Sequence, residues 1–251
     1  MALTDQAIEK IKNLIVEGEF TPGAKLPRER ELAERLGLSR NSLREAVRAL
    51  TLIGVLEPRQ GDGTYVTSLE PELLLAGTTF VSDLLTGATL LELYQVRRIL
   101  EPAATALAAT RLTEDDLEAL AETLARMDTA ETTQAFIDVD VEFHRIIVQA
   151  SGNATLASLI QNLSGGTLRA RVWRAIRERG AVESTRQLHH DIYAALKARD
   201  PDLAAAADLV HLAEGERWLR GMLAQEAAAA RPPGPGDAVS RRGPRPGGGP
   251  T

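Results

Sequence analysis

The fold of the N-terminal third is decided by residues 26–66, which read LPRERELAERLGLSRNSLREAVRALTLIGVLEPRQGDGTYV. Two short segments with apolar residues at helical spacing meet at residues 37–39. Gly37 is typical of a helix end and Ser39 of a helix start. Strand-like segments at 55–59 and 63–68 flank a glycine-rich turn, which predicts a hairpin. A further helical pattern covers residues 4–18. Two helices joined by a short turn and followed by a hairpin indicate a winged helix-turn-helix.

The second helix of this pair is the candidate recognition helix. Arg40, Arg44 and Arg48 are spaced four residues apart, so they share one helix face. Such a row of arginines suits a phosphate backbone. It also suits an ordinary solvated helix in which the arginines pair with Glu45 or Glu34. The spacing alone leaves both interpretations open.

Beyond residue 68 the hydrophobic pattern is helical almost throughout. Helices are expected near residues 70–86, 89–112, 114–130, 133–151, 154–179, 181–199 and 201–229. An all-α bundle of six or seven helices fits this pattern. The predicted fold class is therefore mainly α, with an N-terminal winged helix-turn-helix followed by an all-α helical bundle.

Three regions are expected along the chain. Residues 1–68 form the winged helix-turn-helix domain and residues 69–230 the helical domain. Residues 231–251 contain six Pro and six Gly. Such a segment buries too little apolar surface to offset the entropy of ordering, so we expect a disordered tail.

The composition of the 251 residues supports a helix-rich protein. Ala and Leu supply 74 of the 110 residues in the hydrophobic class, and both favour helices. The absence of cysteine excludes disulfides, thiolate metal sites and a Cys nucleophile. No apolar run reaches the roughly 18 residues of a membrane span, and the N-terminus does not resemble a signal peptide, so a cytoplasmic protein is expected.

The charge is distributed unevenly. The net charge of −6 argues by itself against a nucleic-acid binder. However, residues 1–68 are neutral, with ten basic and ten acidic residues, whereas residues 69–230 carry 15 basic and 24 acidic residues. A neutral domain can still gather its arginines on one face.

The four histidines include a possible metal site. Asp140 and His144 are four residues apart and can reach one ion from one helix face. Helical periodicity places His189 inward and His190 toward solvent, and His211 lies on a third predicted helix. Without thiolates, the set suits Zn²⁺, Ni²⁺, Co²⁺ or Mn²⁺. The alternative is four separate histidines that act as hydrogen-bonding groups at the edge of the core.

The stretch at residues 26–66 resembles the DNA-binding domain of GntR-family bacterial transcription regulators. That family's pattern is LPSERELA, a recognition helix of the form SR-x-x-(L/V)REA-L-x-L, and a G-x-G-(T/S)-x-V wing. The resemblance covers about residues 5–67. Arg28 departs from it, since Ser is common there.

The helical region resembles the FadR-like branch of the same family, with its FCD ligand-binding domain. Residues 93–111 read LYQVRRILEPAATALAATR, residues 140–153 read DVEFHRIIVQASGN, and residues 188–212 carry the last two histidines of the motif. Many members of this branch bind a divalent metal through one Asp and three His. The matching positions here are Asp140, His144, His189 and His211.

The resemblance implies a ligand-responsive transcription regulator, usually a repressor, that binds a palindromic double-stranded operator as a homodimer. The residues it implies for DNA binding are Arg30, Arg40, Asn41, Ser42, Arg44 and Gly61. Arg40 and Arg44 would reach the major groove, Arg30 matches a family position that touches DNA, and Gly61, ranked above Gly63, would let the wing turn sharply.

The implied effector is a small organic acid held by the metal. Arg97 of the VR-x-x-LE motif is the first candidate for its other end, with Asn153 and Arg171 as weaker ones. The alternative for Arg97 is a structural ion pair with Glu101. Two rival functions are a metal-dependent hydrolase and a regulator whose metal is only structural. The hydrolase lacks a candidate general base and gives residues 5–67 no role.

Overall fold

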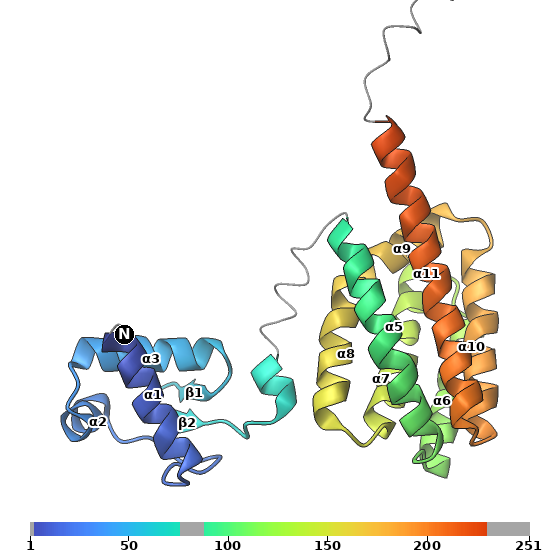
Figure 1. The fold of residues 1–251 in the computed structure, drawn as a ribbon. Helices are drawn as coiled ribbons and strands as arrows, with labels where there is room; N and C mark the ends of the chain where they lie inside the picture. Colours follow the sequence, from blue (N-terminus) through green and yellow to red (C-terminus); the bar gives the residue numbers. More distant parts are fainter. Residues whose placement is uncertain (1–2, 76–87, 230–251) are drawn as a thin grey trace, which may run out of the picture.

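The computed structural model describes residues 3–75 and 88–229, which Figure 1 shows as a ribbon. The expected tail at 231–251 lies outside the described residues, as does the predicted helix at 70–86 from residue 76 onward. Residues 71–75 are helical.

The N-terminal part is a winged helix-turn-helix, as the sequence predicts. Its elements are α1 (Leu3–Val16), α2 (Glu29–Leu36), α3 (Arg40–Leu52), β1 (Leu56–Arg59) and β2 (Gly63–Val66). The two strands pair antiparallel, with Leu56 opposite Val66. Gly37 ends α2 with φ 63°, and the Ser39 hydroxyl begins α3 by accepting a hydrogen bond from the Ser42 backbone N–H.

One apolar core holds the three helices and the hairpin together. Its buried members come from every element and from the loop between α1 and α2: Ala7, Ile11, Phe20, Leu26, Leu32, Ala33, Leu43, Ala46, Leu50, Leu56 and Val66. The apolar residues of α3 that join this core lie on one face of the helix. The charged residues of α3 follow the same helical period, so burial of the apolar face leaves them on the opposite face, in solvent.

The second part is an all-helical bundle, also as predicted. Residues 88–229 form α5 (Ala88–Ala109), α6 (Glu114–Asp128), α7 (Thr133–Ala150), α8 (Ala154–Gly166), α9 (Leu168–Arg177), α10 (Ala181–Lys197) and α11 (Pro201–Ala229). Thr113 and Asp116 form the capping box that begins α6. None of the helices in the described ranges has the length and hydrophobicity that crossing a bilayer requires.

The single helix expected over 154–179 is wrong, because the structure divides it into α8 and α9. The chain breaks after Gly165 and Gly166, two residues with poor helix propensity. Thr167 lies at the break, and its hydroxyl donates to the Ser164 carbonyl oxygen at 3.0 Å and accepts from Arg97 Nη1 at 2.6 Å. The break thus coincides with a contact to the distant helix α5.

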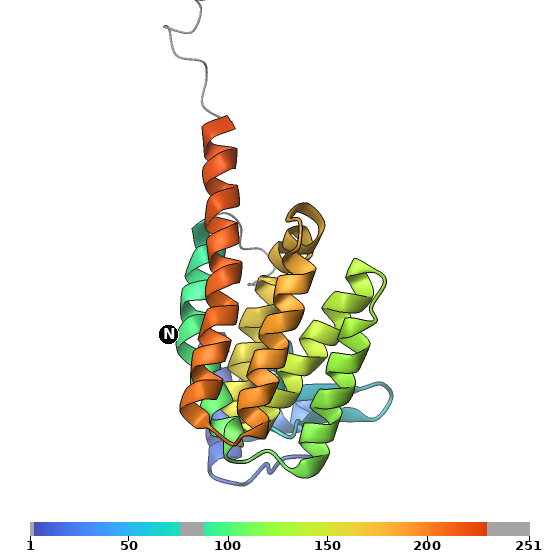
Figure 2. The ribbon, with the colours of Figure 1, turned by 90° about the vertical axis from the view of Figure 1, so that its right-hand side faces the viewer.

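The longest helices, α5 and α11, lie side by side in both views (Figures 1 and 2). Gly215 on α11 allows this approach, because a Cβ atom there would lie 3.0 Å from the ring and hydroxyl of Tyr94 on α5. The largest core cluster of the bundle is built instead from α5, α6, α7, α10 and α11, and it includes Phe143, Ile192 and Leu196. The histidine-bearing faces of α7, α10 and α11 border this cluster.

Candidate DNA-binding surface and metal centre

The recognition helix α3 presents arginines to solvent. Arg40 and Asn41 are exposed at its N-terminus, and Arg44 follows one turn later with its side chain 51% exposed. Arg44 lies 3.4 Å from Glu29, a long contact between exposed groups, and Arg48 pairs with Glu45 at 2.8 Å. The pairing with Glu45 that the sequence left open is therefore made by Arg48.

The remaining predicted contacts fall into two groups. Arg30 on α2 is exposed and, like Arg40, has no ion-pair partner among the described residues. Ser42 differs from the expectation, because its side chain is buried and its hydroxyl lies 2.9 Å from that of Ser39. Ser42 therefore strengthens the helix cap instead of facing outward.

The wing carries a group of residues that the sequence analysis did not single out. Lys25 Nζ lies 2.5 Å from Asp62, the Tyr65 hydroxyl donates to Asp62, and the guanidinium of Arg59 lies 4.2 Å from the centre of the Tyr65 ring. The Lys25 chain passes so close to Gly63 that a Cβ there would lie 2.8 Å from Lys25 Cε, whereas the space around Gly61 is open. The available signal was Arg59 two residues before the G-D-G turn and Tyr65 two residues after it.

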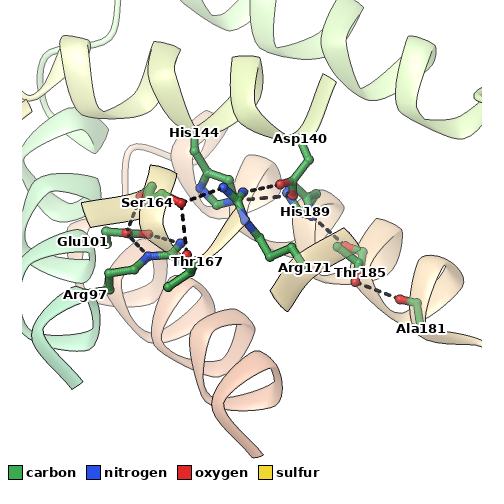
Figure 3. Close-up of polar contacts among 10 residues, drawn as sticks. All are labelled: Arg97, Glu101, Asp140, His144, Ser164, Thr167, Arg171, Ala181, Thr185 and His189. Atoms are coloured by element: carbon green, nitrogen blue, oxygen red, sulfur yellow. Dashed lines mark hydrogen bonds and ion pairs between the residues drawn. The ribbon is translucent and has the colours of Figure 1, made fainter. Parts of the chain in front are cut away.

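Four side chains converge on one point inside the bundle. Asp140 and His144 come from α7, His189 from α10 and His211 from α11, and their ligand atoms lie within 4.8 Å of one another. All are buried or nearly so, His144 being the most exposed at 12%. Figure 3 shows His144, His189 and Asp140 facing one another.

Whether the cluster suits a metal ion is tested by its imidazole nitrogens. These nitrogens are held in place and lack hydrogen-bond partners. His189 Nδ1 donates to the Thr185 carbonyl oxygen at 2.7 Å, which leaves Nε2 free to act as a ligand. Nε2 of His144, Nε2 of His189 and Nδ1 of His211 are buried and make no hydrogen bond, although His189 Nε2 lies 3.0 Å from Asp140 Oδ1. Such buried groups normally have partners. Three imidazole nitrogens and one carboxylate around one point are a ligand set for a borderline divalent metal.

The electrostatic environment keeps Asp140, His144 and His211 in their metal-binding protonation states. Burial lowers the pKa of His144 to about 3 and also holds the pKa of His211 well below its usual range, so both rings stay neutral. Burial alone would raise the pKa of Asp140, but Arg171 and His189 outweigh it and hold that pKa well below its usual range. Neutral imidazoles and an ionised carboxylate are the forms that bind a metal.

His190 lies apart from this cluster, as helical periodicity predicts. Its side chain is 42% exposed and contacts Asp128 at 3.0 Å, whereas His189 is fully buried. Adjacent histidines on one helix thus face a buried site and the solvent.

The three predicted effector residues have three different positions. Arg171 on α9 is at the cluster: Nη1 donates to Asp140, Nη2 donates to the Ser164 carbonyl oxygen at 3.2 Å, and Nε has no partner. Asn153 is not at the cluster; it is exposed, and its side chain caps α8 by accepting from the Leu156 N–H at 3.1 Å. The available signal for that role was the sequence Ser151-Gly152-Asn153 between two predicted helices, because Asn is a preferred residue at the start of a helix.

Arg97 is buried behind the cluster in an ion pair with Glu101. Its Nε and Nη2 donate to the two Glu101 carboxylate oxygens at 2.5 and 3.1 Å. Burial disfavours both charges, yet the pairing raises the pKa of Arg97 and lowers that of Glu101. The geometry is thus the ion pair that the sequence analysis held open as an alternative for Arg97.

Asp208 is a buried acid that the sequence analysis missed. It accepts a hydrogen bond from Thr105 at 2.8 Å through Oδ2, and its Oδ1 has no partner. Burial, with the nearby Glu101 carboxylate, raises its pKa to about 7. The available signal was its position one turn before His211 on α11.

A small cavity reaches the cluster. Its volume is about 30 Å³, and its lining includes Arg97, Asp140, Arg171 and His211. A single water needs roughly 10–15 Å³, so the cavity has room for water but not for an organic acid.

Known proteins match both parts of the chain. The pattern described as "Bacterial regulatory proteins, gntR family" matches residues 3–66, and that of the "FCD domain" matches residues 92–214. The HTH-type transcriptional regulator LutR of Bacillus subtilis (strain 168) is 32% identical over 220 residues, which are 83% of this chain and 97% of that protein. The Galactonate operon transcriptional repressor of Escherichia coli (strain K12) is 28% identical over 229 residues, 86% of this chain and 96% of that protein.

A solved structure agrees with these relatives. The chain superposes on Streptococcus agalactiae GntR with a TM-score of 0.61 at 30% identity, covering 85% of this chain and 99% of the other. A winged helix-turn-helix followed by a helical domain of this kind defines a DNA-binding transcription regulator. The chain belongs to the GntR family of bacterial transcription regulators, and its second domain is an FCD domain.

Proposed function

We propose that this regulator binds one divalent metal ion per chain at Asp140, His144, His189 and His211, and that a small organic acid bound at this centre controls its attachment to DNA. The observation that carries the proposal is the convergence of one ionised carboxylate and three buried imidazole nitrogens that lack partners. The ion could be Zn²⁺, Ni²⁺, Co²⁺ or Mn²⁺. When bound, it supplies positive charge that attracts a carboxylate.

Arg171 supports an acidic effector. Its guanidinium already binds a carboxylate, that of Asp140, and its Nε remains without a partner. An arginine can hold a second carboxylate through charge-assisted hydrogen bonds. The name of the galactonate operon repressor refers to a sugar acid, which is the same chemical class.

Arg97 serves this centre in a different way. Its Nε and Nη2 already donate to the Glu101 carboxylate inside the protein, so this side of the guanidinium is not available to bind an effector carboxylate. It therefore positions α5 against Thr167 at the break between α8 and α9. In this role it supports the start of α9, the helix from which Arg171 reaches the centre.

On the DNA side, the proposed contacts are Arg30, Arg40, Asn41, Arg44 and the wing at Gly61. They lie on the exposed side of α2, α3 and the hairpin, away from the apolar core. A homodimer would present two such surfaces to a palindromic operator, because half-site symmetry matches protein symmetry. Release by the effector makes the regulator a repressor.

Metal content is the first test. The purified protein should hold about one divalent ion per chain by elemental analysis. Asp140→Asn and His211→Ala should lose it, since each removes one ligand, whereas the matched control His190→Ala should keep it. Retention of metal in both ligand variants would refute the proposed centre.

The response to effector is the second test. A thermal-shift screen of small carboxylic acids identifies compounds that stabilise the parent protein. Fluorescence anisotropy of labelled operator at fixed salt then measures release by the identified acid. Asp140→Asn should still bind operator but need a much higher acid concentration for release. If a metal-free, folded Asp140→Asn protein is released at the parental concentration, the metal is only structural.

A further inference from the structure

The surface above the metal centre is unusually rich in arginine. Five of the 15 basic residues of the helical region fall within the eleven residues 169–179, in a region that carries 24 acidic residues. Arg174, Arg177 and Arg179 from this segment, together with Arg217 from α11, line an open cleft of about 630 Å³ between α9, α10 and α11. Two glutamates also line it, so its positive charges outnumber its negative ones.

Two of these arginines are available to a ligand. Arg179 and Arg217 are exposed, and among the described residues neither has an ion-pair partner within 4 Å. Trp218 and Met222 give the cleft an apolar floor. A cleft lined mainly by one sign of charge concentrates ions of the opposite sign and speeds their binding.

Arg174 forms the wall between this cleft and the small cavity at the metal centre. Arg174 and Ala181 line both spaces. The Arg174 side chain is 11% exposed, and it is tied to Glu178 at 2.7 Å and to Glu214 on α11 at 3.1 Å. Ser184 on α10 donates to the same Glu214 at 2.8 Å. This group of contacts connects three helices at the boundary between the two spaces.

The inner cavity of about 30 Å³ is too small for an organic acid, so an acid that came from the arginine-lined cleft would need this cavity to widen. We propose that the arginine-lined cleft is the entry site for the acidic effector, and that the Arg174 ion pairs with Glu178 and Glu214 are its gate. This inference rests on the proposed function of the metal centre. Arg179 and Arg217 attract the anion, which then displaces Arg174 from its glutamates and passes to Arg171 and the metal ligands.

A second route is structurally possible and provides the control. A groove of about 250 Å³ between α7, α8 and α9 also reaches His144 and Arg171, but its walls are mostly apolar and include Val141, Val148 and Ile160. Its exposed cation is Arg145, which donates to Gln149. Arg145→Glu therefore reverses one charge beside the other route, the same charge change as Arg179→Glu alone.

The rate of anion entry tests the proposal. The full-length protein is loaded with Co²⁺, and binding of oxalate is followed by stopped-flow absorbance of the cobalt bands. Arg179→Glu/Arg217→Glu should lower the association rate constant about tenfold at low salt, with much less effect at high salt, and leave the dissociation rate within about twofold. Arg145→Glu should match the parent. An unchanged rate in the double variant, or a slowed rate in Arg145→Glu alone, would overturn the assigned route.

The gate has its own variant. Arg174→Met keeps much of the side chain's bulk but removes both ion pairs, so it should raise the association and dissociation rate constants together. Rate constants equal to those of the parent would show that Arg174 is not the gate.

A measurement without metal separates this proposal from the proposed function. In a Trp173→Phe background, Trp218 in the cleft is the single tryptophan left of the two. The quantity measured is the quenching of Trp218 fluorescence by iodide relative to quenching by neutral acrylamide. This ratio should be higher with Arg179 and Arg217 present than in the Arg179→Glu/Arg217→Glu variant. Equal quenching would refute anion capture by the cleft. If oxalate leaves the cobalt spectrum of the parent unchanged, the metal centre does not anchor carboxylates, and the proposed function fails whatever the quenching shows.

Discussion

On α3 the side chains of Arg44 and Arg48 are 51% and 70% exposed, whereas in the bundle those of Arg97 and Asp140 are 1% and 2% exposed. The exposed arginines make weak or local contacts that contribute little to the stability of the fold. They can therefore exchange these contacts for contacts with an external partner. Arg97 makes three hydrogen bonds and Asp140 is paired with Arg171, and removing one member of such a buried pair leaves the other charge unpaired in a dry environment. Substitutions in the first region should therefore affect binding, and those in the second should affect folding.

The largest effect on stability is expected from Glu101→Ala. This variant leaves the Arg97 guanidinium buried without its carboxylate, which costs about 3–5 kcal/mol for pairs of this kind. The free energy of unfolding from urea titrations followed by circular dichroism measures the loss. Arg97→Met/Glu101→Leu removes both charges and should be much milder. A Glu101→Ala protein as stable as the parent would contradict the comparison.

Arg44→Ala probes the exposed region. It should weaken binding to operator DNA by about 1–3 kcal/mol if the guanidinium reads a base, and leave the free energy of unfolding unchanged. Anisotropy with a duplex selected from a random pool measures the affinity. Arg126→Ala, which removes an exposed ion pair with Glu142 in the bundle, is the matched control. Equal operator affinity in Arg44→Ala and the control would remove α3 from the recognition surface.

Two helix caps compare the regions directly. Ser39→Ala and Thr132→Ala each delete a hydroxyl that caps a helix, α3 in one case and α7 in the other. Each should lower stability by about 1 kcal/mol. Only Ser39→Ala should also weaken DNA binding, because only α3 carries the proposed contacts. Loss of DNA affinity in Thr132→Ala would show that the two regions are not separable in this way.

The smallest effect is expected from His190→Ala. His190 and Asp128 form an exposed pair, and such pairs contribute about 0–1 kcal/mol. Thermal unfolding and metal content should both stay close to those of the parent. A clear loss of metal here would overturn the assignment of His189 as the inward residue.

Local signals made the fold predictable. Gly37 and Ser39 mark a helix end and a helix start, and the structure places both ends there. Periodicity also separated buried His189 from exposed His190, because neighbouring positions on a helix face directions about 100° apart. Signals of this kind depend on a few consecutive residues, so one sequence is enough to read them.

Other features required contacts between distant residues. At the end of α8, Thr167 accepts a hydrogen bond from Arg97, seventy positions away. Asn153 matched a family motif, yet its side chain accepts a hydrogen bond from the Leu156 N–H in the first turn of α8. Asp208 had no local signal beyond its spacing to His211, and its raised pKa arises from burial and from Glu101 on α5.

The sequence by itself determined a helical protein with a winged helix-turn-helix, because caps, turns and apolar periods act over one or two helical turns. Its resemblance to a known family indicated a transcription regulator. Only the tertiary structure decided which atoms meet. It brought four ligand atoms from α7, α10 and α11 within 4.8 Å and placed Arg174 between the centre and the arginine-lined cleft. The physical reason is that helix packing depends on the shapes of side chains far apart along the chain, and no local spacing encodes it.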